Sequence, residues 1–403
     1  MKRKVLFVVD EKKLGGVNVV LENLLNNLNL NKLDITLLVL HNTGTALNNL
    51  NSNINVIYGT KAFEVIDQDF KYLLKSRRYI KAIKKLILSL KIKNGSINKF
   101  ILKQREKMNL DKYDVEVAFK SGFCSLFVAY SDASTKINWV HEDYKTYNMT
   151  KRYENTFKKV FEAFDKHIIV SSDAAKSFNN IYHQEEKTIV IENYINEENL
   201  KNVSLDNNKH NKNIYTLDKA KTNIVTLGRF CDEKGFDRLI EAINILKGKL
   251  DITKLKVNIL GYGELEETLN KQIKQLKLEN VIEIYNTQKI KINAYAFLKE
   301  HDLFVMPSRS ESFGMTRIEA LILGVPVLTT NVANSDKLIH KDYGIIVENT
   351  TEDLAQGILS LIQNKDKLKE LKQNVQNYSY SKENERIISE VQKLLEEKSE
   401  TKE

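Results

Sequence analysis

The chain is poor in the residues that cross-link, kink or bridge a protein. Only two cysteines and two prolines occur among its 403 residues. The cysteines, Cys124 and Cys231, are far apart, and neither lies in a CxxC motif or beside a histidine. This usage argues against a disulfide framework or a cysteine metal site and is typical of a reducing compartment.

Metal-ligand patterns and long apolar runs are also missing. The seven histidines include no HExxH motif and no pair at ligand spacing, so we expect no protein metal site. Asp67 and Asp69 could hold a divalent ion on a diphosphate, but such a pair arises often by chance. No stretch reaches the ~18 apolar residues of a membrane-spanning helix. The first apolar run ends at Asp10, which favours a buried strand over a signal peptide and predicts a cytoplasmic protein.

The positive charge is concentrated in one segment. Residues 71–107 carry thirteen lysines and arginines against a single acid, Glu106, whereas the whole chain has a net charge of +9. Apolar residues are interleaved with these cations. Such a basic amphipathic segment indicates peripheral contact with anionic membrane, or a lysine-rich helix whose apolar stripe packs on its own domain. A basic patch can also bind nucleic acid, but we do not predict a nucleic-acid partner.

The length and the apolar pattern predict two domains. Residues 1–200 alternate strands with helices, with apolar runs at Val5–Val9, Ile35–Leu40, Ile54–Tyr58, Val115–Phe119, Ile137–His141, Ile168–Ser171 and Thr188–Glu192. Residues 201–221 are rich in Asn and Lys and predict a linker. Residues 222–380 alternate again, with runs at Ile224–Leu227, Val257–Leu260, Ile282–Tyr285, Leu303–Met306, Val327–Thr330 and Ile345–Val347. Residues 381–403 predict an amphipathic helix.

This alternation predicts an α/β fold with two doubly wound, Rossmann-like sheets and a cleft between the domains. Ligands of such sheets bind beyond the carboxyl ends of the strands, so the loops that follow the strands hold the candidate residues.

The most informative loop follows the strand Leu303–Met306. A polar loop ending at Gly314 leads into a predicted helix, the arrangement that presents free backbone N–H groups to an anion. Glu311 lies in the loop and Glu319 lies in the first turns of the helix. Carboxylates this close to a phosphate are expected to accept hydrogen bonds from hydroxyls, and a sugar nucleotide supplies both groups.

Two cations follow the strand Ile224–Leu227. Arg229 and Lys234 could neutralise a diphosphate whose charge grows as it leaves. The alternative is a pair of surface cations beside Asp232 and Glu233.

Three further loops are weaker candidates. Gly261 and Gly263 with Glu264, and the Gly15–Gly16 pair, offer bare backbone to a ligand, although a tight turn explains them equally well. His141 ends a predicted strand, where it is either structural or placed to contact a sugar hydroxyl or handle a proton.

Taken together, these motifs resemble those of the retaining GT-B glycosyltransferases of family 4, in the bacterial surface-polysaccharide group. The resemblance rests on Gly-Arg-Phe-x-x-x-Lys-Gly, Gly-Tyr-Gly-Glu, Glu-Ser-Phe-Gly-x-x-x-x-Glu-Ala and Gly-x-Pro-Val, and on Trp-Val-His-Glu-Asp in the first half. It is dense over residues 223–331 and thinner over 1–200.

The resemblance implies roles for matching residues. Arg229 and Lys234 would grip the donor diphosphate, Glu311 would contact the transferred sugar, and His141 would lie near the reacting carbon. The implied donor-binding set is Gly15, Gly16, Gly261, Gly263, Glu264, Ser312, Phe313, Gly314, Met315 and Glu319.

The predicted function is transfer of a hexose or N-acetylhexosamine from a nucleoside-diphosphate sugar, with UDP favoured. The resemblance implies retention of configuration, no metal, and a lipid-linked or glycan acceptor. A sugar-nucleotide epimerase of the same fold and a non-catalytic partner subunit of another transferase are the alternatives.

Overall fold

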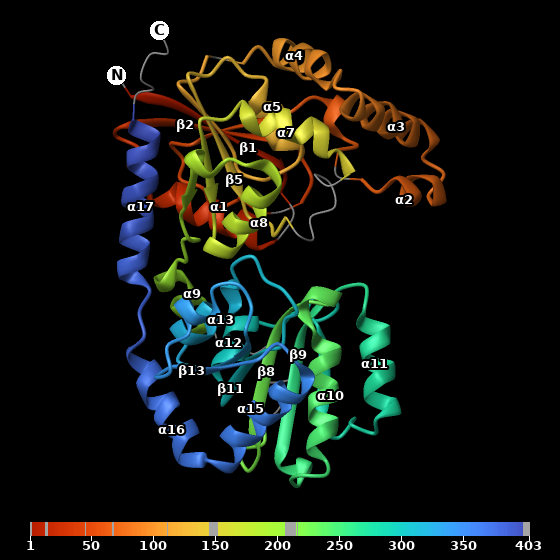
Figure 1. The fold of residues 1–403 in the computed structure, drawn as a ribbon, viewed down its shortest axis with the longest axis vertical. Helices are drawn as coiled ribbons and strands as arrows, with labels where there is room; N and C mark the ends of the chain where they lie inside the picture. The colour runs from red at the N-terminus through yellow and green to blue at the C-terminus, as the bar shows by residue number, and fades with distance from the viewer. Residues whose placement is uncertain are drawn as a thin grey trace. The chain divides into compact units, whose positions relative to one another are not determined.

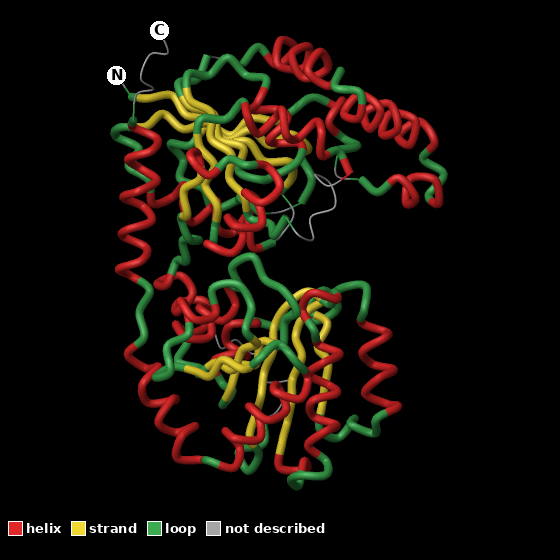
Figure 2. Tube along the Cα trace, viewed as in Figure 1, coloured by secondary structure: helices red, strands yellow, loops and turns green. Residues whose placement is uncertain are grey.

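The computed structural model describes residues 2–12, 15–44, 46–66, 68–110, 112–144, 152–205, 215 and 217–397. The chain forms two compact units (Figures 1 and 2). The N-terminal unit comprises Met1–Tyr194 together with Glu383–Glu403, and the C-terminal unit comprises Ile195–Lys382.

The N-terminal unit is built on a seven-stranded parallel sheet in the order β3-β2-β1-β4-β5-β6-β7. Its strands are β1 (Arg3–Glu11), β2 (Leu33–His41), β3 (Asn55–Tyr58), β4 (Val115–Ala118), β5 (Thr135–Val140), β6 (Lys166–Ile169) and β7 (Thr188–Val190). Its helices are α1 (Gly16–Asn27), α2 (Phe70–Lys75), α3 (Tyr79–Lys93), α4 (Ile97–Met108), α5 (Phe123–Ala129), α7 (Glu154–Glu162), α8 (Ser172–Tyr182) and α17 (Ser381–Glu396). The central strands are apolar along their length because helices cover both faces of the sheet.

The C-terminal unit has a six-stranded parallel sheet in the order β10-β9-β8-β11-β12-β13. Its strands are β8 (Thr222–Arg229), β9 (Leu255–Tyr262), β10 (Ile282–Asn286), β11 (Leu303–Met306), β12 (Val327–Thr330) and β13 (Gly344–Val347). Its helices are α9 (Glu197–Leu205), α10 (Phe236–Leu246), α11 (Glu266–Gln275), α12 (Ala294–Lys299), α13 (Met315–Ile322), α14 (Ser335–Leu338), α15 (Thr351–Gln363) and α16 (Lys365–Asn374). All thirteen strands predicted from apolar runs are present.

Each sheet is doubly wound, so the direction of its connections reverses at one point. In the C-terminal unit the reversal lies between the neighbouring strands β8 and β11, and in the N-terminal unit between β1 and β4. The loops after these strands diverge to opposite faces and leave a crevice at the carboxyl edge of the sheet. The topology therefore brings the loop after β8 and the loop after β11 together.

The last helix completes the N-terminal unit. Ile387, Val391 and Leu395 recur every four residues on α17 and are buried. Arg386 forms an ion pair with the buried Glu192, and Lys32 pairs with Glu396 at 3.0 Å. The final segment of the chain therefore packs against elements whose sequence lies near its start.

One prediction about a connecting segment is wrong. Residues 201–205 do not belong to a linker, because they end helix α9, which packs against α12 and α13. Residues 206–214 and 216 of the predicted linker lie outside the described residues.

The basic segment consists of parts of three helices. Arg77 and Gly95 adopt left-handed backbone conformations that separate α2, α3 and α4.

The candidate metal-binding pair is only half described. Asp67 lies outside the described residues. The side chain of Asp69 caps α2 by accepting a hydrogen bond of 2.8 Å from the backbone N–H of Tyr72.

Candidate functional site

The loop between β11 and α13 is shaped by one glycine. Gly314 precedes α13 with a φ of 77°, in the left-handed region. A Cβ atom there would lie 2.9 Å from Nε of Arg317, so a side chain is excluded by sterics as well as by conformation. The chain can then turn sharply from the loop into a helix whose first N–H groups end at the carboxyl edge of the sheet.

A buried arginine holds this turn in place. Arg317 has no exposed surface, and its guanidinium donates hydrogen bonds of 2.7 Å to the carbonyl oxygen of Phe313 and to Oγ of Ser335. It also donates to the carbonyl oxygen of Ala333. Burial lowers the pKa of Arg317 to about 10, so the group stays charged at neutral pH. Arg317 joins the β11–α13 loop to the segment after β12.

Replacing Arg317 with methionine is expected to destabilise the protein by about 3 kcal/mol or more, because buried carbonyl and hydroxyl acceptors lose their donor. Urea unfolding followed by circular dichroism measures this change. Lys271→Met on the exposed face of α11 is the control and is expected to stay within about 0.5 kcal/mol of the original chain. A loss below about 1 kcal/mol for Arg317→Met would contradict the bracing role.

Lys234 and Glu311 meet at the junction of the two loops. Nζ of Lys234 lies 2.6 Å from Oε1 of Glu311, and Oγ of Ser308 donates to the same oxygen at 2.7 Å. The Glu311 side chain is only 7% exposed, and that of Lys234 is 25% exposed. The structure therefore joins two of the residues that the sequence singled out, although they are 77 positions apart.

Glu319 is buried near the contact between Lys234 and Glu311. Its carboxylate accepts a hydrogen bond of 3.3 Å from the hydroxyl of Tyr295. Burial raises the pKa of Glu319 to about 7, against the opposing effects of that hydrogen bond and of the positive charge of Lys234. A desolvated carboxylate with few donors around it is suited to accept hydrogen bonds from ligand hydroxyls.

A second ion pair joins the β11–α13 loop to the first turn of α10. Arg309 makes a two-pronged contact with Asp237, with Nη1–Oδ1 and Nη2–Oδ2 distances of 2.8 and 2.6 Å. The backbone N–H of Arg309 donates to the carbonyl oxygen of Glu233 at 2.8 Å. These contacts tie the backbone next to Lys234 to the loop that carries Glu311, and so fix the positions of both side chains.

Other predicted residues lie at the same edge of the sheet without joining this contact. Arg229 is the last residue of β8 and is exposed. A hydrogen bond from Cys231 lowers the pKa of Glu233 most, and the charge of Arg229 lowers it further. Gly261, at the end of β9, is needed for packing, since a Cβ there would lie 1.8 Å from the carbonyl oxygen of Gly228. Gly263 and Glu264 line a surface groove of about 590 Å³ beside α11.

The N-terminal unit carries its candidates at the carboxyl edge of its own sheet. His141 directly follows β5, is 9% exposed, and packs against Phe119 with ring centroids 4.8 Å apart. Burial and the nearby charge of Lys120 lower the pKa of His141 to about 3. The imidazole is therefore neutral near pH 7 and is suited to hydrogen bonding rather than to acting as a cationic acid.

The point where this sheet reverses direction also carries polar residues. Lys120, just after β4, forms an ion pair of 2.7 Å with Asp10 of β1. Gly15 and Gly16 begin helix α1, and no described atom lies within 4 Å of a Cβ built on Gly15. The space above Gly15 in this unit is therefore open to an approaching group.

Several residues of the site escaped the sequence analysis. Ser308, Tyr295, Arg317 and the Arg309–Asp237 pair were not predicted. The opposite charges of Arg309, in the loop after β11, and Asp237, in the first turn of α10, were a usable signal. The sequence around Tyr295 did not indicate a site residue, because Tyr295 reaches Glu319 from the short helix α12.

Within the described part of the chain, no group of three or more His, Cys, Asp or Glu side chains is placed to hold a metal ion. No helix within those residues combines the length and the apolar content needed to cross a bilayer.

Comparison with known proteins connects these loops to a family of enzymes. Residues 207–378 match the family model for glycosyl transferases group 1. An uncharacterized 41.2 kDa protein of the Klebsiella pneumoniae cps region is 34% identical over 30% of this chain and 31% of its own length. An uncharacterized glycosyltransferase of Methanocaldococcus jannaschii is 30% identical over 53% and 60%, respectively. The Staphylococcus aureus capsular polysaccharide biosynthesis glycosyltransferase CapM is 32% identical over 41% and 43%. The matched regions thus span about a third to three-fifths of these relatives.

Solved structures match nearly the whole chain. HepE of Anabaena, solved in complex with UDP and glucose, superposes with a TM-score of 0.67 at 17% identity, over 96% of this chain and 99% of that chain. The lipopolysaccharide glycosyltransferase WaaG superposes with a TM-score of 0.67 at 13% identity, over 97% and 99%.

The fold is GT-B. The predicted fold class, two doubly wound Rossmann-like domains, is thereby confirmed. The group 1 match lies within the C-terminal unit of this GT-B chain and includes β8, β11 and the contact between Lys234 and Glu311. The family match and the relatives support a glycosyltransferase.

Proposed function

We propose that the protein is a retaining glycosyltransferase of family 4 that moves a hexose or N-acetylhexosamine from a nucleoside-diphosphate sugar, with UDP favoured. The observation that carries the proposal is the meeting of Lys234 with Glu311 above the buried Glu319. A cation beside two desolvated carboxylates matches a ligand that has both a diphosphate and several hydroxyls.

Each group has a role in this proposal. Lys234, with Arg229, neutralises the diphosphate as its charge grows on leaving, in place of a divalent ion. Glu311 accepts hydrogen bonds from the transferred sugar, and Glu319 accepts them from the ribose. Backbone N–H groups at Phe313, Gly314 and Met315 face the phosphate and the sugar, as the first turn of a helix allows.

The reaction breaks the bond between the anomeric carbon and the phosphate oxygen and forms a bond from that carbon to an acceptor hydroxyl oxygen. The hydroxyl proton passes to the departing phosphate oxygen, so no separate protein base is required. Attack on the face that the phosphate leaves gives retention. The neutral His141 acts by hydrogen bonding to the sugar rather than by proton transfer.

The known proteins support a place in cell-surface polysaccharide or glycoconjugate synthesis. CapM acts in capsular polysaccharide biosynthesis, and WaaG is involved in lipopolysaccharide biosynthesis. HepE was solved with UDP and glucose. We therefore propose a lipid-linked or glycan acceptor and a location at the inner face of the cell membrane.

A panel of nucleotide sugars tests this function. At a concentration 100-fold above its Kd, the true donor is expected to add about 2.7 kcal/mol to the free energy of unfolding, which raises Tm by several degrees. UDP-glucose, UDP-N-acetylglucosamine, GDP-mannose and free glucose are compared by thermal melting. The anomeric configuration of the product is then read by NMR, with and without EDTA.

Retention and a rate unchanged by EDTA are the expected results. Inversion, or activity that is lost with EDTA and restored by a divalent ion, would contradict the mechanism. Isomerisation of the donor without an acceptor would indicate an epimerase, and the absence of any nucleotide-sugar binding would indicate a non-catalytic subunit.

A further inference from the structure

Helix α3 has an apolar stripe on each of two opposite faces. Ala82, Leu88 and Ile92 are buried against the N-terminal unit. Ile80, Ile83, Ile87 and Leu90 follow the helical spacing of three and four residues on the other side, and their exposed fractions are 75%, 57%, 48% and 52%. The alternative in which the apolar stripe of this segment packs on its own domain explains the first face only.

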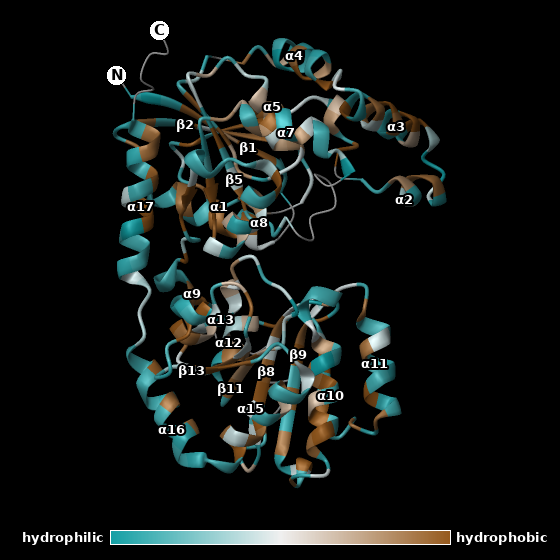
Figure 3. Ribbon diagram, in the orientation of Figure 1, coloured by the Kyte–Doolittle hydropathy of each residue, from teal (hydrophilic) through white to brown (hydrophobic). Residues whose placement is uncertain are grey.

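The outward stripe extends over the neighbouring helices. Ten of the fourteen large apolar side chains exposed among the described residues lie on α2, α3 and α4. They are Phe70, Tyr72, Leu74, Tyr79, Ile80, Ile83, Leu86, Ile87, Leu90 and Leu102. Figure 3 shows the apolar colouring along α2 and α3. Scattered apolar residues are normal on a protein surface, but a contiguous patch marks an interaction site.

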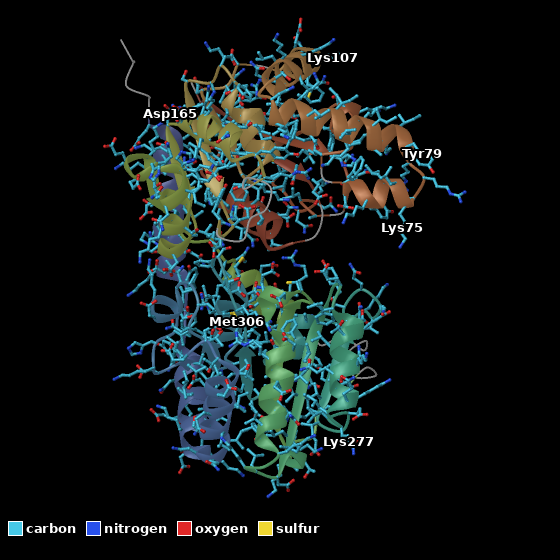
Figure 4. All side chains as sticks on the ribbon, turned by 45° about the vertical axis from the view of Figure 1, so that its right-hand side comes forward. Lys75, Tyr79, Lys107, Asp165, Lys277 and Met306 are labelled. Atoms are coloured by element: carbon cyan, nitrogen blue, oxygen red, sulfur yellow. The ribbon has the colours of Figure 1, made fainter. Side chains whose placement is uncertain are left out.

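Cations without an ion-pair partner surround this patch. Within the described chain, nine basic residues of the segment make no ion pair, namely Lys71, Lys75, Arg77, Arg78, Lys91, Lys93, Lys99, Lys103 and Lys107. By contrast, Lys81 and Lys84 pair with Glu64, and Arg105 pairs with the buried Glu116. Figure 4 labels Lys75 and Tyr79 where α2 ends and α3 begins, and Lys107 near the end of α4.

We propose that the face formed by α2, α3 and the exposed side of α4, here called the basic apolar face, docks on an anionic lipid bilayer. Apolar side chains enter the boundary between headgroups and acyl chains, while the long lysine side chains reach outward to the phosphates. Tyr72 and Tyr79 have the amphipathic shape favoured at that depth.

The cations and the apolar side chains of this face argue against two other binding partners. A second copy of the chain would bring the same cations together across a two-fold axis, where they would repel. Nucleic acid would use the lysines but would leave Ile80, Ile83 and Ile87 exposed to water, since phosphate contacts need no apolar stripe. An anionic bilayer satisfies both components.

Flotation of the full chain with vesicles tests the proposal. The protein is expected to bind vesicles of 70% phosphatidylcholine and 30% phosphatidylglycerol, to bind pure phosphatidylcholine at least 10-fold more weakly, and to be released as salt is raised. The variant Ile83→Gln/Ile87→Gln is expected to lose at least 10-fold in vesicle affinity, and Lys91→Glu/Lys93→Glu is expected to do the same.

The matched control is Val203→Gln/Leu205→Gln, which removes two exposed apolar side chains from α9 and is expected to bind vesicles unchanged. The melting temperature and the nucleotide-sugar shift of every variant should equal those of the original chain, which separates this test from that of the enzymatic function. Equal vesicle binding by Ile83→Gln/Ile87→Gln would overturn the proposal. Two other results would also overturn it. One is a dimer, seen by light scattering, that becomes a monomer when these two residues are replaced. The other is binding to a nucleic-acid duplex instead of vesicles, at an affinity that the two substitutions leave unchanged.

Discussion

Replacing Lys234 with alanine lowers kcat/KM for sugar transfer by a factor of about 100 to 1,000. The ammonium group lies 2.6 Å from Glu311, at the place where the proposed diphosphate gains charge as it leaves. Losing one preorganised donor to a developing oxyanion costs two to three orders of magnitude in rate. Initial rates with the donor identified by thermal melting measure the effect. The loss should appear in kcat as well as in KM, because the interaction strengthens in the transition state.

A second lysine–glutamate pair of the same sheet supplies the control. Lys256 of β9 contacts Glu283 of β10 at 2.8 Å, and this pair is not part of the candidate site. Lys256→Ala is expected to keep kcat/KM within about twofold of the original value, since an exposed pair contributes little. A Lys234→Ala variant that folds and turns over at the original rate would remove the basis of the proposed mechanism.

Replacing Glu319 with glutamine has opposite effects on stability and on donor binding. The pKa of Glu319 is raised from the ordinary 4.5 to about 7, so between these pH values the folded protein binds a proton that the unfolded chain releases. Stability therefore falls as pH rises from about 4.5 to about 7 and then levels off. A glutamine does not ionise. Glu319→Gln is thus expected to be more stable than the original chain at pH 8, by up to about 3 kcal/mol, and equally stable near pH 4.5.

Donor binding changes in the other direction. A carboxylate that accepts hydrogen bonds from ribose hydroxyls binds them more strongly than an amide does, so Glu319→Gln is expected to weaken nucleotide affinity by about 10- to 100-fold. Urea melts at pH 4.5 and pH 8 and calorimetry with UDP measure the two effects. Glu385→Gln on the exposed surface of α17 should change neither. A Glu319→Gln variant that binds UDP as tightly as the original chain would exclude a contact with the nucleotide.

The strands were predictable because both faces of a parallel sheet are covered. Runs such as Leu303–Met306 and Val327–Thr330 appear in the structure with the predicted bounds. The doubly wound architecture also followed from the alternation of strands and helices, since a right-handed crossover admits few topologies. The placement of Glu311 in a loop at the carboxyl edge of the sheet was therefore a consequence of the local pattern.

The supporting contacts were not predictable from local pattern. Tyr295 reaches Glu319 across 24 positions, and Arg317 reaches Ser335 across 18. Each contact depends on how a helix is rotated against the loop. Neither secondary-structure propensities nor the spacing of apolar residues predicts that rotation. The linker prediction failed at residues 201–205 for a related reason. Their polar composition favoured a loop, but Leu200 and Ser204 give α9 a buried side against α12 and α13.

The route of the chain into α17 has a consequence for biosynthesis. Glu192 forms its ion pair with Arg386, and the apolar surface covered by Ile387, Val391 and Leu395 stays uncovered until those residues have left the ribosome. The N-terminal unit therefore cannot reach its final form while the C-terminal unit is still being translated, although domains usually fold in the order in which they are made. A nascent chain stalled before residue 381 would expose this surface to chaperones and proteases for the whole synthesis time of the second half.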